Sequence, residues 1–337
     1  MLRIGPLAIS MPAVQAALSG YSDRAMRVVA RRRGCAYALN EVVLDRLVDD
    51  DYRRVGADDH PIGGQLMGSE PRQFAQAAAE LVDAGYDVVD INFGCPVRKV
   101  LGRCRGGYLL SEPQGALAIV RAVLDTVGGR RPVTLKMRRG FDGSPDSERS
   151  FWTILDGAFA AGVAAITVHG RTVEQRYVGP SDWSFLARVK RHAGARTILG
   201  SGDLFTATAV KRILDETGVD GASVARGAIG NPFIFRECAE LLAGRPLPPP
   251  PTVAEQRAAL DEHWALAAEE GNAMSMRAVG IRYAELHPMR NDVRRAFIDA
   301  PDAAAVRAAI DRWYDPSREW PASVRPEAPD LICAGAR

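Results

Sequence analysis

The stretch TILGSGDLFTATAVKRILDETGVDGASVARGAIGNP, residues 197–232, contains the pattern that decides the fold. A short apolar strand at 197–202 enters the small-residue loop GSGD, a helical segment follows, and a strand at 221–226 enters the loop ARGAIGNP. Strand–helix–strand units of this kind build parallel sheets. Small residues before a helix leave backbone N–H groups free for phosphate, and such loops commonly follow strands 7 and 8 of a TIM barrel.

Six further strand candidates precede this stretch, each followed by a helix-like segment. They are AVQAAL from Ala13, AYALNE from Ala36, IGGQLM from Ile62, VVDINF from Val88, VTLKMR from Val133 and AITVHG from Ala165. Eight such units between Val14 and about Leu242 match a barrel, whereas a doubly wound sheet usually closes with five or six strands. We therefore predict an α/β fold, a (β/α)₈ TIM barrel followed by a small C-terminal helical domain.

The composition of the chain changes after the barrel. The segment RPLPPPPT, residues 245–252, favours a stiff extended connector, and apolar residues then recur at helical spacing. We predict a catalytic barrel over 1–244, a Pro-rich linker over 245–252, a helical domain over 253–315 and an irregular tail over 316–337.

Composition also argues against several classes of protein. The 337 residues are 47% hydrophobic and 25% charged, which suits one large core and a small second domain. We find no membrane-spanning stretch or signal peptide, and the five cysteines are odd in number and scattered, unlike a disulfide framework or a zinc site. We expect a cytoplasmic protein without a metal. Because the net charge is only +2, any nucleic-acid surface must be local.

Polar residues gather at the predicted carboxyl ends of the strands, where TIM barrels carry their chemistry. In DINFGCPVRK, glycine and proline shape a tight turn that would present Cys95 to the barrel mouth; the alternative is a small buried residue. Lys136 on a buried strand should face an anionic ligand unless it extends to solvent. His169 could equally satisfy a local hydrogen bond. No GxGxxG follows the first strand, so a Rossmann-type nicotinamide site is not indicated.

Taken in order, these segments resemble the bacterial tRNA-dihydrouridine synthases. The matching motifs are ALSGYSDRAMR (17–27), QLMGSEP (65–71), DINFGCPVRKV (90–100), VTLKMRRG (133–140), VHGRTVEQRYVGPSDW (168–183), GSGD (200–203) and ARGAIGNPFIF (225–235). They cover essentially the whole barrel, and their ordered combination is far more specific than any single motif.

The resemblance implies an FMN in the barrel mouth. The residues expected to contact it are Ala17, Leu18 and Ser19 along the flavin, Gln65, Lys136 and His169 at the ring, and Ser201, Gly202, Asp203, Ala225 and Arg226 at the phosphate. A lysine at the N1/O2 edge is reasonable because reduced flavin is anionic there.

The resemblance further implies reduction of the uracil C5–C6 double bond of a tRNA uridine, with hydride passing from flavin N5 to C6. Cys95 would donate the proton to C5, Asn92 would orient the base, and NADPH would reduce the flavin. The chain departs from the family pattern at Ala17 and Leu18 (usually Pro-Met), Ser201 (usually Asn), Ala225 (usually Gly) and in GRCRGGYLL, which carries Cys104. Cofactor contacts at the first four positions are largely through the backbone, so we expect FMN binding to persist.

The expected macromolecular partner is tRNA, bound by a monomer. Arg98, Lys99 and Arg171 near the barrel mouth are candidate RNA contacts, and residues 271–298 of the helical domain carry five arginines against two acids. A solvated helix face remains the alternative there. Two other functions stay open: a flavin reductase of a small molecule, similar to dihydroorotate or dihydropyrimidine dehydrogenase, and a catalytically silent RNA-binding barrel.

Overall fold

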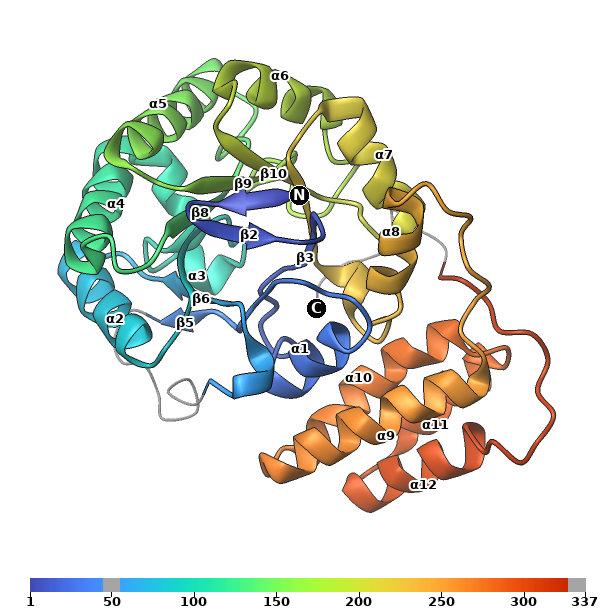
Figure 1. The fold of residues 1–337 in the computed structure, drawn as a ribbon. Coiled ribbons are helices and arrows are strands. Elements are labelled where there is room, and N and C mark those ends of the chain that lie inside the picture. Colours follow the sequence, from blue (N-terminus) through green and yellow to red (C-terminus); the bar gives the residue numbers. More distant parts are fainter. Residues whose placement is uncertain (45–54, 327–337) are drawn as a thin grey trace.

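A computed structural model of the chain describes residues 1–44 and 55–326. At its centre, parallel strands close into a barrel (Figure 1). The barrel strands are β3 (Ala13–Gln15), β4 (Ala38–Leu39), β6 (Ile62–Met67), β7 (Val88–Phe93), β8 (Val133–Arg138), β9 (Ala165–His169), β10 (Thr197–Ser201) and β11 (Gly221–Val224). The barrel closes because β4 pairs with both β3 and β6. The predicted TIM barrel is confirmed, and each predicted strand contains one of these strands.

Helices cover the outside of the barrel (Figure 1). They are α1 (Arg24–Arg31), α2 (Pro71–Asp83), α4 (Pro113–Val127), α5 (Pro145–Ala161), α6 (Trp183–Ala193), α7 (Ala207–Thr217) and α8 (Ile234–Leu242). Proline opens α2, α4 and α5, where its missing N–H costs nothing. We expected a helix after every strand, but in the described part β4 leads instead to β5 (Val43–Leu44) and a 3₁₀ turn at Ala57–Asp59. Residues 45–54 between them lie outside the described part.

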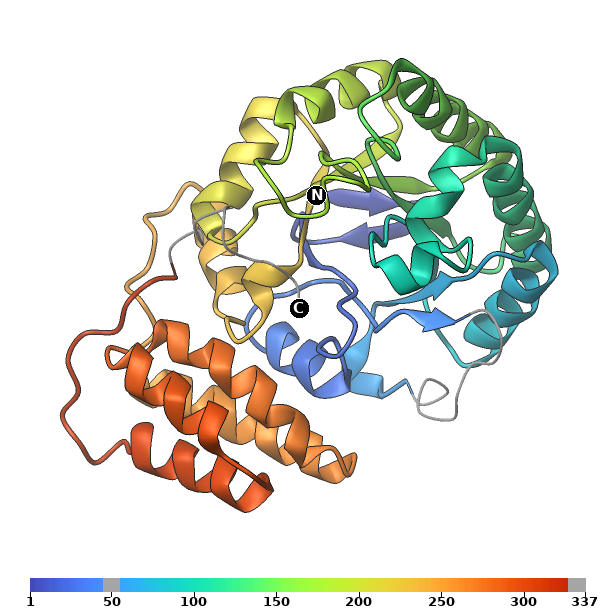
Figure 2. The ribbon, with the colours of Figure 1, turned by 180° about the vertical axis from the view of Figure 1, so that it is seen from behind.

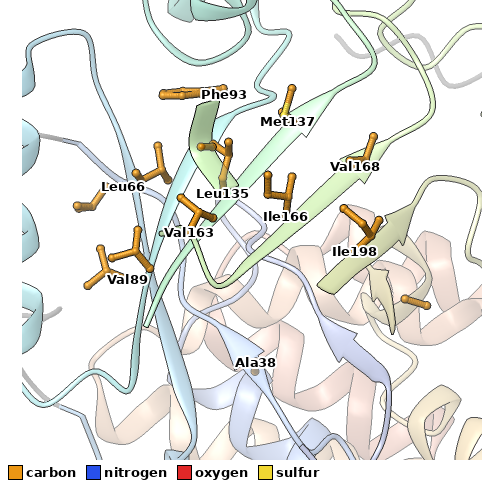
Figure 3. Close-up of a cluster of buried hydrophobic side chains, with 14 of the residues drawn as sticks. Ala38, Leu66, Val89, Phe93, Leu135, Met137, Val163, Ile166, Val168 and Ile198 are labelled. Atoms are coloured by element: carbon orange, nitrogen blue, oxygen red, sulfur yellow. The ribbon is translucent and has the colours of Figure 1, made fainter. Parts of the chain in front are cut away.

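Alternation along the strands sorts side chains between two layers. On β8, Val133, Leu135 and Met137 belong to the apolar layer under the helices, and Figure 3 shows this layer spreading over neighbouring strands. Lys136 and Arg138, at the alternate positions, line the cavity at the barrel mouth. Successive side chains of a strand point to opposite faces. When the apolar residues of β8 pack against the helices, the alternate residues Lys136 and Arg138 must therefore face the inside of the barrel.

An N-terminal hairpin, β1 (Leu2–Ile4) and β2 (Leu7–Ile9), was not predicted from the sequence. Its Leu2, Ile4 and Ile9 are almost completely buried and pack with barrel residues that include Val14 and Leu199. The hairpin therefore adds to the apolar core inside the barrel, while the cavity lies at the carboxyl ends of the strands.

The remaining helices form a bundle beside the barrel (Figures 1 and 2). They are α9 (Val253–Glu269), α10 (Met276–Tyr283), α11 (Arg290–Asp299) and α12 (Ala303–Trp313). A capping box between Thr252 and Glu255 begins α9 directly after the prolines. Side chains of α1 join the apolar core of the bundle, which fixes it against the barrel. The exact domain limits stay a prediction. Within the described ranges, no helix is both long and apolar enough to cross a membrane.

Candidate active site

A cavity of about 400 Å³ opens at the carboxyl ends of the barrel strands, a size within the ~300–1,000 Å³ typical of ligand sites. Residues from every part of the barrel line it. Those named from the sequence are Ala17, Leu18, Ser19, Gln65, Asn92, Cys95, Lys136, His169, Ser201, Gly202, Asp203, Ala225 and Arg226. The predicted thiol, lysine and small-residue loops therefore converge on one cavity.

Strand register explains why these residues meet. Asn92 lies opposite Lys136 in the ladder, and His169 lies opposite both Arg138 and Ser201. The register aligns these strand ends around the barrel, and inward-facing side chains at the same level share one space. Positions far apart in the sequence thus become neighbours.

A chain of hydrogen bonds holds the amides of the site. Gln65 Nε2 donates to Asp90 Oδ2 at 2.7 Å, and Asn92 Nδ2 donates to Gln65 Oε1 at 2.7 Å. Asn92 Oδ1 accepts from the Gly94 N–H at 2.8 Å. Burial raises the pKa of Asp90, opposed by hydrogen bonds from Thr134 and Gln65. One buried carboxyl group thereby fixes both amide side chains and the start of the cysteine turn.

The turn that carries Cys95 is packed against two glycines further along the chain. A Cβ on Gly106 would lie 2.9 Å from the Cys95 Cβ and 3.2 Å from Met67 Sδ, and Gly106 has φ +58°. The Gly107 N–H donates to the Cys95 carbonyl at 3.0 Å. The segment GRCRGGYLL thus holds the cysteine turn in place. Cys104 of the same segment is exposed and does not line the cavity.

Cations dominate the charge of the cavity wall. Burial and the nearby Arg138 lower the pKa of Lys136 to about 8, opposed by Asp90. Burial likewise lowers the pKa of Arg138 to about 10. Such shifts arise when positive groups are crowded in a partly dehydrated space without enough counter-charge. The site is therefore prepared for an anionic ligand.

His169 is neutral in this setting. Burial, together with Arg138 and other cations, lowers its pKa well below the ordinary value. An Arg171 Nη1 atom lies 3.3 Å from His169 Nε2. Because a guanidinium can only donate, Nε2 must accept this bond, and the ring proton is then on Nδ1. His169 can therefore offer an N–H to a ligand in the cavity that it lines.

The loops after β10 and β11 form the opposite end of the cavity. Among the described residues, the N–H groups of Gly202 and Asp203 have no protein acceptor. The Arg226 guanidinium lies over two rings, 4.5 Å from the Tyr177 centroid and 4.8 Å from that of Phe205. Free amides beside a held guanidinium match the chemistry of a phosphate site.

The predicted RNA contacts separate into two groups. Arg98 and Lys99 lie exposed on the short helix α3 (Arg98–Leu101), just past the cavity-lining Val97, so their RNA contact stays a prediction. Arg171 differs from expectation: its side chain is 0% exposed, and its Nη2 bonds both Asp203 carboxylate oxygens at 2.7 Å. A guanidinium without exposed surface cannot contact RNA in this conformation. Arg171 instead holds the Asp203 carboxylate in place through this ion pair.

Several cavity residues were not predicted from the sequence. They are Arg138, Tyr177, Phe205 and Arg282, among others. Arg138 stands two positions after Lys136 on the same strand, so the period-2 pattern could have found it. Tyr177 lies in a loop and Arg282 on α10 of the bundle, and periodicity carries no signal for either position.

Comparison with known proteins agrees with this geometry. The sequence profile described as dihydrouridine synthase (Dus) matches residues 14–311, which is most of the chain. The chain belongs to the dihydrouridine synthase family. As a family member, it is similar to a protein of Xanthomonas axonopodis pv. citri named tRNA-dihydrouridine synthase B, with 33% identity over 93% of this chain and 95% of the relative. A Mycobacterium tuberculosis relative named probable tRNA-dihydrouridine synthase is 32% identical over 92% of this chain and 84% of its own.

Solved structures share the fold of this chain at low sequence identity. A morphinone reductase in complex with tetrahydroNAD has a TM-score of 0.53 at 13% identity, covering 74% of this chain and 91% of its own. A 2-naphthoyl-CoA reductase complex has a TM-score of 0.58 at 11% identity, covering 93% and 69%. At these identities the likeness concerns the barrel architecture alone.

Proposed function

We propose that this chain reduces the C5–C6 double bond of uridine in tRNA to dihydrouridine, as a cytoplasmic monomer with FMN as resident cofactor and NADPH as reductant. The observation that carries the proposal is the convergence of Cys95, Lys136 and the loops after β10 and β11 on one cavity. Family membership and the names of the relatives, which specify tRNA, support the substrate.

The residues of the cavity fit FMN. The free N–H groups of Gly202 and Asp203, with Arg226 beside them, would hold the phosphate. Lys136 and the Nδ1–H of His169 would hold the polar edge of the ring, and the backbone of residues 17–19 would lie along it. FMN, when bound, supplies the hydride that adds to C6 of the uracil.

The other chemical roles belong to the protein. Cys95 would donate the proton to C5 from the turn that Gly106 and Gly107 hold in place. The side-chain amide of Asn92 already makes two hydrogen bonds, one with Gln65 and one with the Gly94 N–H. These bonds fix the direction of its remaining N–H, which can orient the base. The exposed Arg98 and Lys99 would bind the RNA backbone beside the mouth.

The test is a stopped-flow experiment on the flavin-loaded full chain and its Cys95→Ala variant. Each protein is reduced with NADPH under anaerobic conditions and mixed with unmodified tRNA, and flavin reoxidation and dihydrouridine formation are measured. We expect NADPH reduction to be unchanged in the variant, and tRNA-dependent reoxidation to slow about 100-fold or more, the usual contribution of a general acid.

Cys104→Ala is the matched control, because Cys104 lies in the neighbouring segment but outside the cavity, and we expect it to react like the wild type. Undiminished dihydrouridine formation by Cys95→Ala would remove the thiol from the mechanism. Reoxidation by a free unsaturated pyrimidine such as orotate or uracil, but not by tRNA, would favour the small-molecule reductase. A protein that binds RNA but no flavin would support the silent barrel.

A further inference from the structure

Arg282 is an arginine of the helical bundle that lines the barrel cavity. It lies in the last turn of α10, exposed at the rim of the cavity that Arg226 and Gly227 also line. Within residues 1–44 and 55–326, no carboxylate lies within salt-bridge distance of it, whereas Arg257, Arg294 and Arg307 of the same bundle have such partners. Arg282 thus presents an unneutralised charge to this cavity.

The charge balance beside Arg282 calls for an anion. Arg226, another cation of the cavity wall, is 3.8 Å from Asp203, but that carboxylate already binds Arg171 through both oxygens and accepts the Ser181 N–H at 2.7 Å. Arg282 further lowers the pKa of Arg226. Two guanidinium groups without a carboxylate of their own suit a doubly charged phosphate monoester.

The position of Arg282 is built into the junction between barrel and bundle. Gly230, in the loop after β11, has φ +66°, and a Cβ there would lie 2.4 Å from the Tyr283 N and 2.5 Å from the Arg282 carbonyl carbon. Only glycine allows the two backbones to approach this closely. The phosphate-end loop and the Arg282 backbone are therefore held together.

We propose that Arg282 binds the phosphate group of the cofactor, so that the cofactor bridges the barrel and the helical bundle. This rests on the proposed function, in which the loops after β10 and β11 hold that phosphate. Arg226 would bind it from the barrel and Arg282 from α10. Cofactor loading would then fix the bundle, which is the predicted RNA-binding part, against the barrel mouth.

The test compares FMN with riboflavin, which lacks the phosphate, on the flavin-free full chain. Dissociation constants are measured by flavin fluorescence for the wild type, Arg282→Ala and Arg282→Lys. We expect Arg282→Ala to weaken FMN binding about 5- to 10-fold, in the range of one charge-assisted hydrogen bond, and to change riboflavin binding less than about twofold. Arg282→Lys should recover part of the loss.

Hydrogen exchange in α10 should slow with FMN in the wild type, but not with riboflavin or in Arg282→Ala.

Arg312→Ala is the control, because Arg312 is an exposed arginine of the same bundle that does not line the cavity. Equal FMN affinity in Arg282→Ala and the wild type would overturn the inference while leaving the proposed function intact. Weaker tRNA binding with unchanged FMN affinity would assign Arg282 to the RNA surface and overturn it as well. A wild type that binds neither flavin would overturn the proposed function and this inference with it.

Discussion

At the scale of the residue, Lys136 is the group whose charge the barrel controls most directly. Its pKa of about 8 results from burial and Arg138, so the free protein loses this charge as pH rises from 7 to 9. An anion bound beside it would raise that pKa again. Binding should therefore take up a proton when the pH is slightly above 8, and affinity should fall as pH rises through this range.

We expect FMN binding at pH 8.5 to take up protons in the wild type and much less in Lys136→Met. Calorimetry in two buffers of different ionisation enthalpy measures the difference. Lys211→Met serves as the control, since Lys211 lies on α7 and pairs with Asp215 at the surface. If Lys136→Met took up protons like the wild type, another group would have to be responsible.

At the scale of the element, the segment between β9 and α6, residues 170–182, which we call the strap, contributes Tyr177 to the cavity wall. Arg138 Nη1 donates to the carbonyls of Thr172 and Arg176 at 2.9 and 2.7 Å. Arg171 Nε donates to the Gly179 carbonyl at 2.8 Å, and Asp203 accepts from Arg171 and the Ser181 N–H. Hydrogen bonds from the buried side chains of Arg138 and Arg171 therefore hold the strap, which places Tyr177 beside Arg226.

The variant Asp203→Asn should remove the counter-charge of a fully buried guanidinium. We expect the free energy of unfolding to fall by about 3 kcal/mol, because breaking a buried ion pair leaves one charge uncompensated. Urea denaturation followed by fluorescence gives this value. The exposed pair of Lys211 and Asp215 supplies the comparison, and Asp215→Asn should cost less than about 1 kcal/mol. Equal stability of the two variants would contradict a structural role for the Arg171–Asp203 pair.

At the scale of the whole molecule, the segment after α12 ties barrel, linker and bundle together. The Trp320 ring packs 4.9 Å from that of His287, and its Nε1 donates to the Asp315 carbonyl at 2.8 Å. Further along, Arg325 contacts both Glu237 of α8 and the Pro248 carbonyl of the linker. The predicted irregular tail is non-helical through residue 326, yet it is docked, and residues 327–337 lie outside the described part.

Trp320→Ala should lower the free energy of unfolding by about 1–2 kcal/mol, less than the ~3–5 kcal/mol of a fully buried tryptophan. FMN affinity should not change, because none of the described residues of this segment, up to residue 326, lines the cavity. Val324→Ala is the matched control, since the tail bonds Leu286 through the Val324 backbone and the side chain is exposed. Thermal and urea unfolding of both variants measure this difference. A Trp320→Ala protein with the free energy of unfolding of the wild type would show that the docking of Trp320 contributes no stability.

Much of the fold and the site could be predicted because the signals are local. Each barrel strand is an apolar run whose alternate residues must face either helices or cavity, so Gln65, Asn92 and Lys136 were recognisable as inward groups. Parallel strands end at one rim, which brings such residues together without knowledge of the contacts. The loops at 200–203 and 225–232 were recognisable from their small residues alone.

What only the tertiary structure decided are the contacts between separate segments. The sequence predicts a surface position for Arg171, but the fold buries its side chain against Asp203, 32 residues away. The hairpin β1–β2 is too short for a period to be visible, and Arg282 reaches the cavity only because α10 packs on Gly230. Periodicity reports which face of an element is apolar. Which charge meets which depends on how elements distant in sequence pack, and that information is not local.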